Sequence, residues 1–184
     1  MADLSLDPAK SRVRIRTFAE GLFAKLAHDL ELECKKLEGS ASRKDDSLTV
    51  GTANIDVPVG AIEVGGILKG DTVDDRGLSA SDRADCLEKM RKDVFQCGPS
   101  GTVRVSVVLD AGSARVKIVP PNGRAIGRSV RPNVTDDGDG RVRVKGALDV
   151  SLASIGSATV KGPMNAFRVK DRVEILFDVV FGPA

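Results

Sequence analysis

The sequence has very few aromatic residues: six of its 184 residues are phenylalanine, and tryptophan and tyrosine are absent. Protein interfaces usually depend on aromatic anchors, and single-stranded nucleic acids are usually held by aromatic stacking. The low aromatic content therefore argues against both kinds of surface. An excess of one charge is also missing, since 28 basic residues oppose 26 acidic ones and leave a formal net charge of +2. Recruitment of a partner by bulk electrostatic attraction is not implied.

Groups for metal binding and for hydrolysis are equally scarce. His28 is the single histidine, and the three cysteines, Cys34, Cys86 and Cys97, do not have the spacing of metal ligands. No Gly-x-Ser-x-Gly motif supplies a nucleophile. We therefore expect no metal, no cofactor and no catalytic residue.

The sequence also lacks a targeting segment and a long apolar run. Its first ten residues, MADLSLDPAK, have neither a cationic start nor an apolar core, so they do not resemble a secretory signal. No stretch approaches the roughly 20 apolar residues that cross a bilayer. With an odd number of cysteines, interpreted as reduced thiols, these features predict a cytoplasmic protein. A periplasmic location follows instead if a leader was removed.

What the sequence does contain is period-two alternation of aliphatic and charged residues. Residues 12–17 read RVRIRT, and similar rows recur at 103–107, 142–152 and 173–181. Each row predicts a half-buried strand. About eight such strands, separated by turn-type residues, favour an all-β antiparallel barrel, because closure removes exposed edges. The chain length fits one domain over 1–184.

Two segments have helical spacing instead. The principal helix is predicted at about 82–96, with Ser81 or Asp82 available as its N-cap. Its apolar stripe, which we expect to pack against the barrel, consists of Leu87, Met90 and Val94. A short helical segment is predicted at about 19–27. The glycine-rich stretch 65–81 is too long for an ordinary connection and indicates a lid over an opening.

The step His28–Asp29 lies where helical spacing changes to the alternation that begins at Leu30. We favour a structural junction, in which one of the two side chains hydrogen-bonds backbone groups left free between the elements. A polar contact at the mouth of a ligand site is the alternative. A third interpretation, an enzyme that uses His28, predicts that His28→Ala abolishes an activity and leaves stability intact.

Rows of arginine at 12–16, 124–131 and 141–145 raise the question of nucleic-acid binding. Two of these rows alternate with apolar residues, and acidic residues such as Asp136 and Asp137 lie close by in sequence. We interpret the rows as the solvated outer face of the barrel and expect no nucleic-acid partner.

Three long segments carry a family resemblance. The opening LDPAKSRVRIRTFAEGLFAKLAHDLELECKKLEGSA is similar to the start of YceI-like proteins, most of all to a subgroup with a Gly-His-Asp step. Here Ala27 replaces that glycine, while His28 and Asp29 match. SASDRADCLEKMRKDVF resembles the family's helix, and SLASIGSATVKGPMNAFRVKDRVEILFDVVF resembles its ending. The tyrosine-proline step that the wider family places after the helix is absent, since QCGPSGTV stands there.

The resemblance implies a lipocalin-like barrel whose better-known members bind polyisoprenoid chains in an apolar interior, without catalysis. We therefore expect a non-enzymatic carrier of an apolar, chain-like ligand such as an isoprenoid or another lipid. The expected ligand-binding residues are Phe18, Leu22, Phe23 and Leu26 over one mouth, His28 as a polar contact, and Met90, Met164 and Phe167 as lining. The alternative is a scaffold protein whose barrel is filled by side chains and whose outer face or segment 65–81 meets a protein partner. Exposed edges of an incompletely closed barrel would also allow a homodimer.

Overall fold

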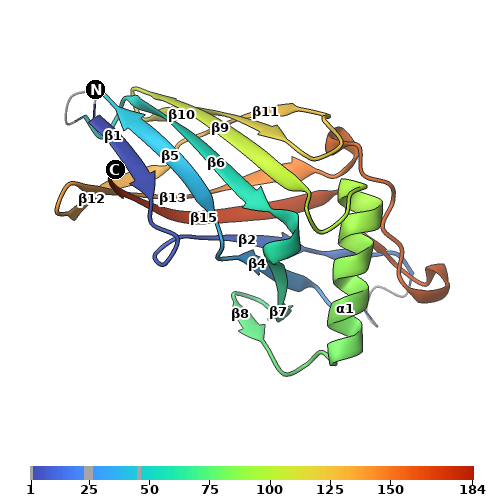
Figure 1. Cartoon of the computed structure of the whole chain (residues 1–184). Coiled ribbons are helices and arrows are strands. Elements are labelled where there is room, and N and C mark those ends of the chain that lie inside the picture. The colour runs from blue at the N-terminus through green and yellow to red at the C-terminus, as the bar shows by residue number, and fades with distance from the viewer. Residues whose placement is uncertain (1, 23–26, 45–46) are drawn as a thin grey trace.

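The computed structural model describes residues 2–22, 27–44 and 47–184 (Figure 1). The strands are β1 Ala2–Leu6, β2 Arg12–Thr17, β3 Ala19–Glu20, β4 Leu30–Cys34, β5 Glu38–Arg43, β6 Gly51–Pro58, β7 Ile62–Lys69, β8 Thr72–Asp74, β9 Thr102–Asp110, β10 Ser113–Val119, β11 Ile126–Val130, β12 Asn133–Gly138, β13 Arg141–Ser151, β14 Arg168–Val169 and β15 Arg172–Pro183. The helical elements are α1 Ala80–Lys89, the π-helical η3 Met90–Phe95, and the short 3₁₀ turns η2 Val59–Ala61, η4 Ala153–Ile155 and η5 Pro163–Asn165. The expected mostly-β architecture is confirmed.

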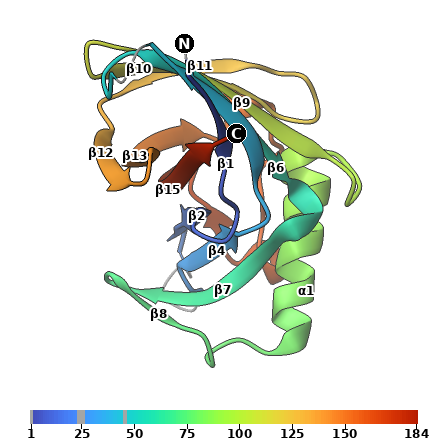
Figure 2. The same cartoon turned by 60° about the vertical axis from the view of Figure 1, so that its left-hand side comes forward.

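Thirteen of these strands form one large antiparallel sheet that curls into a half-barrel (Figures 1 and 2). Its order is β11-β10-β9-β6-β5-β1-β15-β2-β4-β7-β8, and β13 joins the other edge of β15. β15 pairs with β13 along ten positions, from Phe181 opposite Val142 to Arg172 opposite Ser151. Its second edge is shared between β1 and β2.

The sheet does not close through backbone hydrogen bonds between β11 and β13 in the part of the chain that the structure describes. The first half of β13 is instead occupied by β12, which pairs with it from Asn133 to Gly138. Across the remaining gap, the Arg128 guanidinium donates through Nε to the Asp149 carbonyl oxygen at 3.1 Å. The structure therefore has an open curl where the sequence predicted a closed barrel of about eight strands.

The alternating rows determine which face of the sheet is inside. Ile15 lies opposite Leu32 on one neighbouring strand and opposite Ile175 on the other, so the apolar side chains form a continuous inner row. On the outer face, Arg143 makes a two-pronged ion pair with Asp178, with N–O distances of 2.8 and 3.1 Å. That pair lowers the pKa of the Asp178 carboxyl, mainly through its hydrogen bond with Arg143. The arginines of this row have acidic neighbours, as expected for a solvated outer face.

The principal helix is confirmed, since α1 and η3 together run from Ala80 to Phe95. Its N-cap is Ser79, and neither Ser81 nor Asp82 has that position. The Ser79 hydroxyl accepts from the Asp82 backbone N–H at 3.1 Å, and the Asp82 carboxylate accepts from the Ser79 backbone N–H at 3.2 Å. The reciprocal pair satisfies two N–H groups at the helix start and forms a capping box.

Removing this cap is expected to destabilise the protein measurably. Ser79→Ala deletes the hydroxyl that accepts from Asp82, and loss of an N-cap costs about 1 kcal/mol. Urea denaturation should report a lower free energy of unfolding with an unchanged dependence on denaturant. Ser81→Ala, at an exposed helical position two residues later, is the matched control and should leave the stability within about 0.5 kcal/mol. Equal losses in both variants would contradict the assigned cap.

Two sequence predictions about local structure are wrong where the structure describes them. The segment 19–27 begins as strand β3, which pairs with β14, and residues 23–26 lie outside the described residues. The stretch 65–81 is chiefly a hairpin, because β7 continues to Lys69 and β8 returns alongside it. Gly70 makes this tight turn possible with a left-handed φ of 62°. No long irregular lid is present in this stretch.

Candidate ligand cavity

The inside of the curl encloses a cavity of about 330 Å³. Its wall consists of aliphatic side chains, proline, glycine, methionine and phenylalanine, apart from Thr17, Ser42, Arg43, Ser47, Thr52 and the Cys86 thiol. Small-molecule sites in proteins typically have about 300–1,000 Å³ and a mostly apolar lining. The cavity therefore has the size and the chemistry of a site for an apolar ligand.

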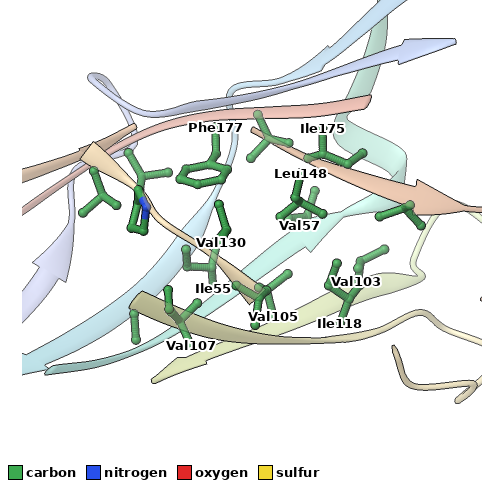
Figure 3. Close-up of a pocket in the computed structure, with 18 of the residues that line it drawn as sticks. Ile55, Val57, Val103, Val105, Val107, Ile118, Val130, Leu148, Ile175 and Phe177 are labelled. Carbon is green, nitrogen blue, oxygen red and sulfur yellow. The ribbon is translucent and has the colours of Figure 1, made fainter. Parts of the chain in front are cut away.

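The strands aim their aliphatic rows at one another across this space, as Figure 3 shows. The labelled side chains are Ile55 and Val57 of β6, Val103, Val105 and Val107 of β9, Ile118 of β10, Val130 of β11, Leu148 of β13, and Ile175 and Phe177 of β15. All of them except Val57 are only half-buried although they point inward. Inward-facing side chains that keep accessible surface indicate a hollow interior, because a close-packed core would cover them.

The size of the lining residues explains why the interior is not filled. Valine is the commonest lining residue, and the sequence offers no tryptophan or tyrosine to occupy the centre. The Phe177 ring lies against the backbone of Gly146, where an added Cβ would come within 2.4 Å of the ring. The absence of a side chain at Gly146 therefore allows the Phe177 ring to lie flat against the cavity wall.

The two ends of the cavity differ in chemistry. Ser42 and Arg43 at the end of β5, with Ser47 and Thr52 beside them in sequence, line the end near the N-terminus (Figure 1). Met90, Val94 and Phe95 of η3 line the opposite end, and all three are buried. Among the described lining residues, Arg43 alone carries a permanent charge. The cavity therefore has one polar end and one apolar end.

Cys86 is the only thiol among the described lining residues, and it faces the cavity from α1. Burial raises the pKa of the Cys86 thiol above its ordinary value. Since the thiolate is the nucleophile, this cysteine reacts slowly at neutral pH.

The expected ligand-binding residues are only partly brought together by the fold. Met90 lines the cavity and is 8% exposed. The others that the structure describes lie outside the lining: Phe18 and Phe167 are half-buried, His28 is exposed, and Leu22 and Met164 are 96% and 99% exposed. Phe23 and Leu26 lie outside the described residues. A ligand contact by these residues stays a prediction.

The sequence analysis did not choose the valines and isoleucines of the central strands as ligand-binding residues. Val105, Val107 and Ile55 line the middle of the cavity. Their signal was present in the sequence as period-two alternation, which already assigned them to the inner face. Phenylalanine and methionine were chosen as site residues for their bulk, whereas a hollow is lined by the smaller side chains that fail to fill it.

The junction at His28–Asp29 has the structural role that was favoured. The Asp29 carboxylate accepts from the Ala19 backbone N–H at 2.9 Å, and its carbonyl oxygen accepts from the Leu68 backbone N–H at 2.8 Å. Asp29 thereby ties β3 and β7 to the start of β4, and a backbone bond by one residue of the pair is confirmed. His28 is exposed and lies near Asp82, whose pKa is lowered chiefly by its hydrogen bonds with Ser79 and further by His28.

These features define a class of protein: a mostly-β chain with one 16-residue helix and a large curled antiparallel sheet around an apolar cavity, the YceI-like fold. One solved structure with this fold is a polyisoprenoid binding domain from Saccharophagus degradans implicated in plant cell wall breakdown. It is 13% identical, with a TM-score of 0.67 over 100% of both chains. BcnA from Burkholderia cenocepacia is 18% identical, with a TM-score of 0.63 over 95% of this chain and 98% of its own.

The structural matches confirm the YceI-like fold that the sequence resemblance implied, and the closed form of the barrel stays a prediction. No protein-family model matches the sequence, and no curated protein matches it. Within the described residues, no helix has the length and apolar character needed to traverse a bilayer.

Proposed function

We propose that this protein is a non-enzymatic carrier of an apolar, chain-like molecule such as an isoprenoid or another lipid. The single observation that carries the proposal is the 330 Å³ cavity with its almost wholly aliphatic wall. An apolar wall gives water few hydrogen-bonding partners, so hydrocarbon is the occupant that it favours. The likeness in fold to a polyisoprenoid binding domain supports the same class of ligand.

The energetics favour a chain over a small apolar molecule. Each buried methylene contributes about 0.8 kcal/mol, whereas association costs on the order of 4–15 kcal/mol. Roughly ten buried carbons are therefore needed before binding becomes useful. We propose that the chain lies along the aliphatic rows of the strands and that its polar end lies at Arg43 and Ser47, where polar side chains interrupt the aliphatic wall.

The single-domain, lipocalin-like barrel is the form that we propose for the working protein. Strands β11-β10-β9-β6-β5-β1-β15-β13 run around the cavity in this order, and β2, β4, β7 and β12 also contribute lining residues. β11 lies beside β13 without a ladder among the described residues. We propose that the Arg128 to Asp149 hydrogen bond closes this side of the barrel. A closure made by one side chain opens more easily than a strand ladder.

The lining argues against catalysis. Among its described residues there is no carboxylate, no imidazole and no lysine, so general acid–base chemistry has no group to use. The Cys86 thiol is held in its neutral form by burial. The alternative of a scaffold with a side-chain-filled barrel is disfavoured by the cavity itself.

Ligand uptake should protect Cys86 from a thiol reagent. We expect delipidated protein to bind geranylgeraniol, a C20 isoprenoid alcohol that is supplied in dilute ethanol because it is poorly soluble in water. At ten times the dissociation constant, about a tenth of the protein remains free, so N-ethylmaleimide should modify Cys86 about tenfold more slowly. Mass spectrometry of the cysteine peptides measures both rates. Cys97 does not line the cavity and is the internal control, whose rate should not change.

Native mass spectrometry of freshly purified protein tests the same proposal without a chosen ligand. We expect an additional mass that organic extraction removes. The absence of any bound species, together with no protection of Cys86 by isoprenoid or fatty chains, would remove the carrier function.

A further inference from the structure

Two large apolar side chains stand almost completely in solvent at one end of the molecule. Leu22 is 96% exposed and Met164 is 99% exposed. The other exposed large hydrophobic residues in the described chain, Val73 and Val108, are 37% and 42% exposed. Exposed apolar groups of this kind mark interaction sites when they gather in one place.

Leu22 and Met164 come from neighbouring segments. β3 pairs with β14 through Glu20 opposite Arg168, and the next residue, Gly21, approaches the Phe167 backbone so closely that an added Cβ would lie 3.7 Å from the Phe167 Cα. Leu22 therefore continues alongside the turn Pro163–Asn165. We call Leu22 and this turn the apolar tip. In Figure 1 the hairpin 160–169 projects beside α1, at the end opposite the N-terminus.

The hairpin that carries Met164 is held in shape by its own contacts. The Val169 N–H donates to the Val160 carbonyl and the Gly162 N–H donates to the Phe167 carbonyl, both at 2.9 Å. At the turn, Met164 and Asn165 have left-handed φ angles of 54° and 57°. Residues with a Cβ adopt this conformation at a cost, so the fold holds Met164 outward against a local preference.

The base of the same hairpin is part of the cavity wall. Val160 and Val169, which its closing hydrogen bond joins, both line the cavity. The hairpin 160–169 therefore connects the apolar tip directly to the wall of the proposed ligand site.

The surroundings of the tip are basic. Residues 157–170 contain Lys161, Arg168 and Lys170 and no acid, and residues 18–22 contribute Glu20, so three positive charges less one negative leave +2. Arg168 is paired with Glu20 at 2.6 Å. Asp171 follows directly, but its carboxylate accepts from the Ala153 backbone N–H at 2.8 Å, away from the hairpin.

We propose that the apolar tip docks on the surface of a bilayer that contains anionic lipids, and, resting on the carrier function, that the ligand enters the cavity from there. Leucine and methionine enter the boundary between headgroups and acyl chains, while Lys161 and Lys170 meet the negative surface. A protein partner fits less well, since a stable interface buries about 1,000 Å² or more with complementary shape, and two separate side chains do not provide it.

Vesicle sedimentation tests the docking directly. The wild-type protein should bind vesicles of equal parts phosphatidylglycerol and phosphatidylcholine, and should bind pure phosphatidylcholine and high-salt samples more weakly. Leu22→Ser with Met164→Ser should lower the partition coefficient about tenfold or more, since both apolar contacts are lost. The matched control, Val73→Ser with Val108→Ser, removes two exposed apolar residues elsewhere and should bind as the wild type does.

The charge requirement is tested separately. Lys161→Glu with Lys170→Glu should weaken binding to the anionic vesicles severalfold, and Lys117→Glu, on the exposed face of β10, should change it little. Thermal unfolding of every variant controls for folding, since all of these side chains are exposed.

Uptake of geranylgeraniol without vesicles, measured as protection of Cys86 from N-ethylmaleimide, distinguishes membrane docking from ligand binding. The tip variant should keep this uptake while losing vesicle binding. The docking proposal falls if the wild type ignores anionic vesicles, if the tip variant binds them equally well, or if the tip instead mediates self-association in sedimentation velocity. Wild-type uptake without vesicle binding would overturn docking and leave the carrier function standing. Vesicle binding without uptake would support docking and remove the carrier.

Discussion

Tryptophan in place of Val105 will abolish chain binding and leave the protein at least as stable as the wild type. Val105 points into the middle of the cavity and is only half-buried there (Figure 3). If the indole takes the room of about four methylenes at about 0.8 kcal/mol each, the loss is about 3 kcal/mol, or roughly 150-fold in affinity. The unfolding free energy should stay constant or rise by about 1 kcal/mol, because the ring fills empty space.

The stability result distinguishes a hollow interior from a filled one. In a close-packed core, a larger side chain forces its neighbours apart and costs about 1–3 kcal/mol. Val108→Trp is the matched control, on the same strand but on the outer face, and should leave binding unchanged. A Val105→Trp protein that is strongly destabilised would show that the cavity is occupied by the protein's own packing. Retained ligand binding would show that the chain lies elsewhere.

Replacing Arg16 with methionine should lower the free energy of unfolding by about 3–5 kcal/mol. Arg16 donates through Nε to the Glu31 carboxylate at 2.9 Å, and the two side chains are only 12% and 8% exposed. Arg16 also contacts the exposed Asp71 carboxylate at 3.4 Å, but its removal leaves the largely buried Glu31 carboxylate without its cation. Glu174, whose carboxylate lies 3.8 Å from Arg16, adds another negative charge to the site. For a chain of this length the melting temperature should fall by roughly 10 °C.

Two further variants show whether the loss comes from the orphaned carboxylate. Arg12→Met, at an exposed position on the same face of β2, should change the stability by about 0.5 kcal/mol or less. Arg16→Met combined with Glu31→Leu removes both charges and should recover most of the stability, as apolar replacements of buried ion pairs do. A double variant as unstable as the single one would show that Arg16 acts through packing alone. Denaturant titration of the wild type and the three variants compares their free energies of unfolding.

Local patterns were sufficient for the elements whose periodicity lies within their own residues. The row RVRIRT was predicted as a strand and is β2, with the same limits. The helix at about 82–96 is present at 80–95, because its apolar stripe repeats at the helical period within a single segment. Its N-cap was missed by two residues, since the turn that precedes the helix determines where the cap lies.

Elements that depend on a distant partner were missed. β3 has two residues and exists because β14, 148 positions later at the Glu20–Arg168 pair, runs beside it. The apolar residues Phe18, Leu22, Phe23 and Leu26 around it recur at helical spacing in the sequence, so the sequence alone predicted a helix there. The hairpin of β7 and β8 was likewise read as an irregular lid, because its glycines resemble those of a loop.

The candidate site shows the same division. Alternation correctly assigned the aliphatic rows to the inner face, and these rows line the cavity. The choice of individual ligand residues by type placed only Met90 there among the described residues, while Leu22 and Met164 stand outside. The type of a residue does not determine whether a turn at the end of the sheet points its side chain into the cavity or into solvent.

The sequence by itself determined which side chains face inward, because a strand alternates its faces with a period of two and puts the charged residues opposite the aliphatic ones. Only the tertiary structure decided that the inside is hollow. The volume of the interior depends on the curl of the sheet and on pairings between remote strands, such as Val142 opposite Phe181 or Gly51 opposite Leu109. Such pairings determine the distance between opposite apolar faces of the curled sheet, and a local sequence pattern contains no information about that distance.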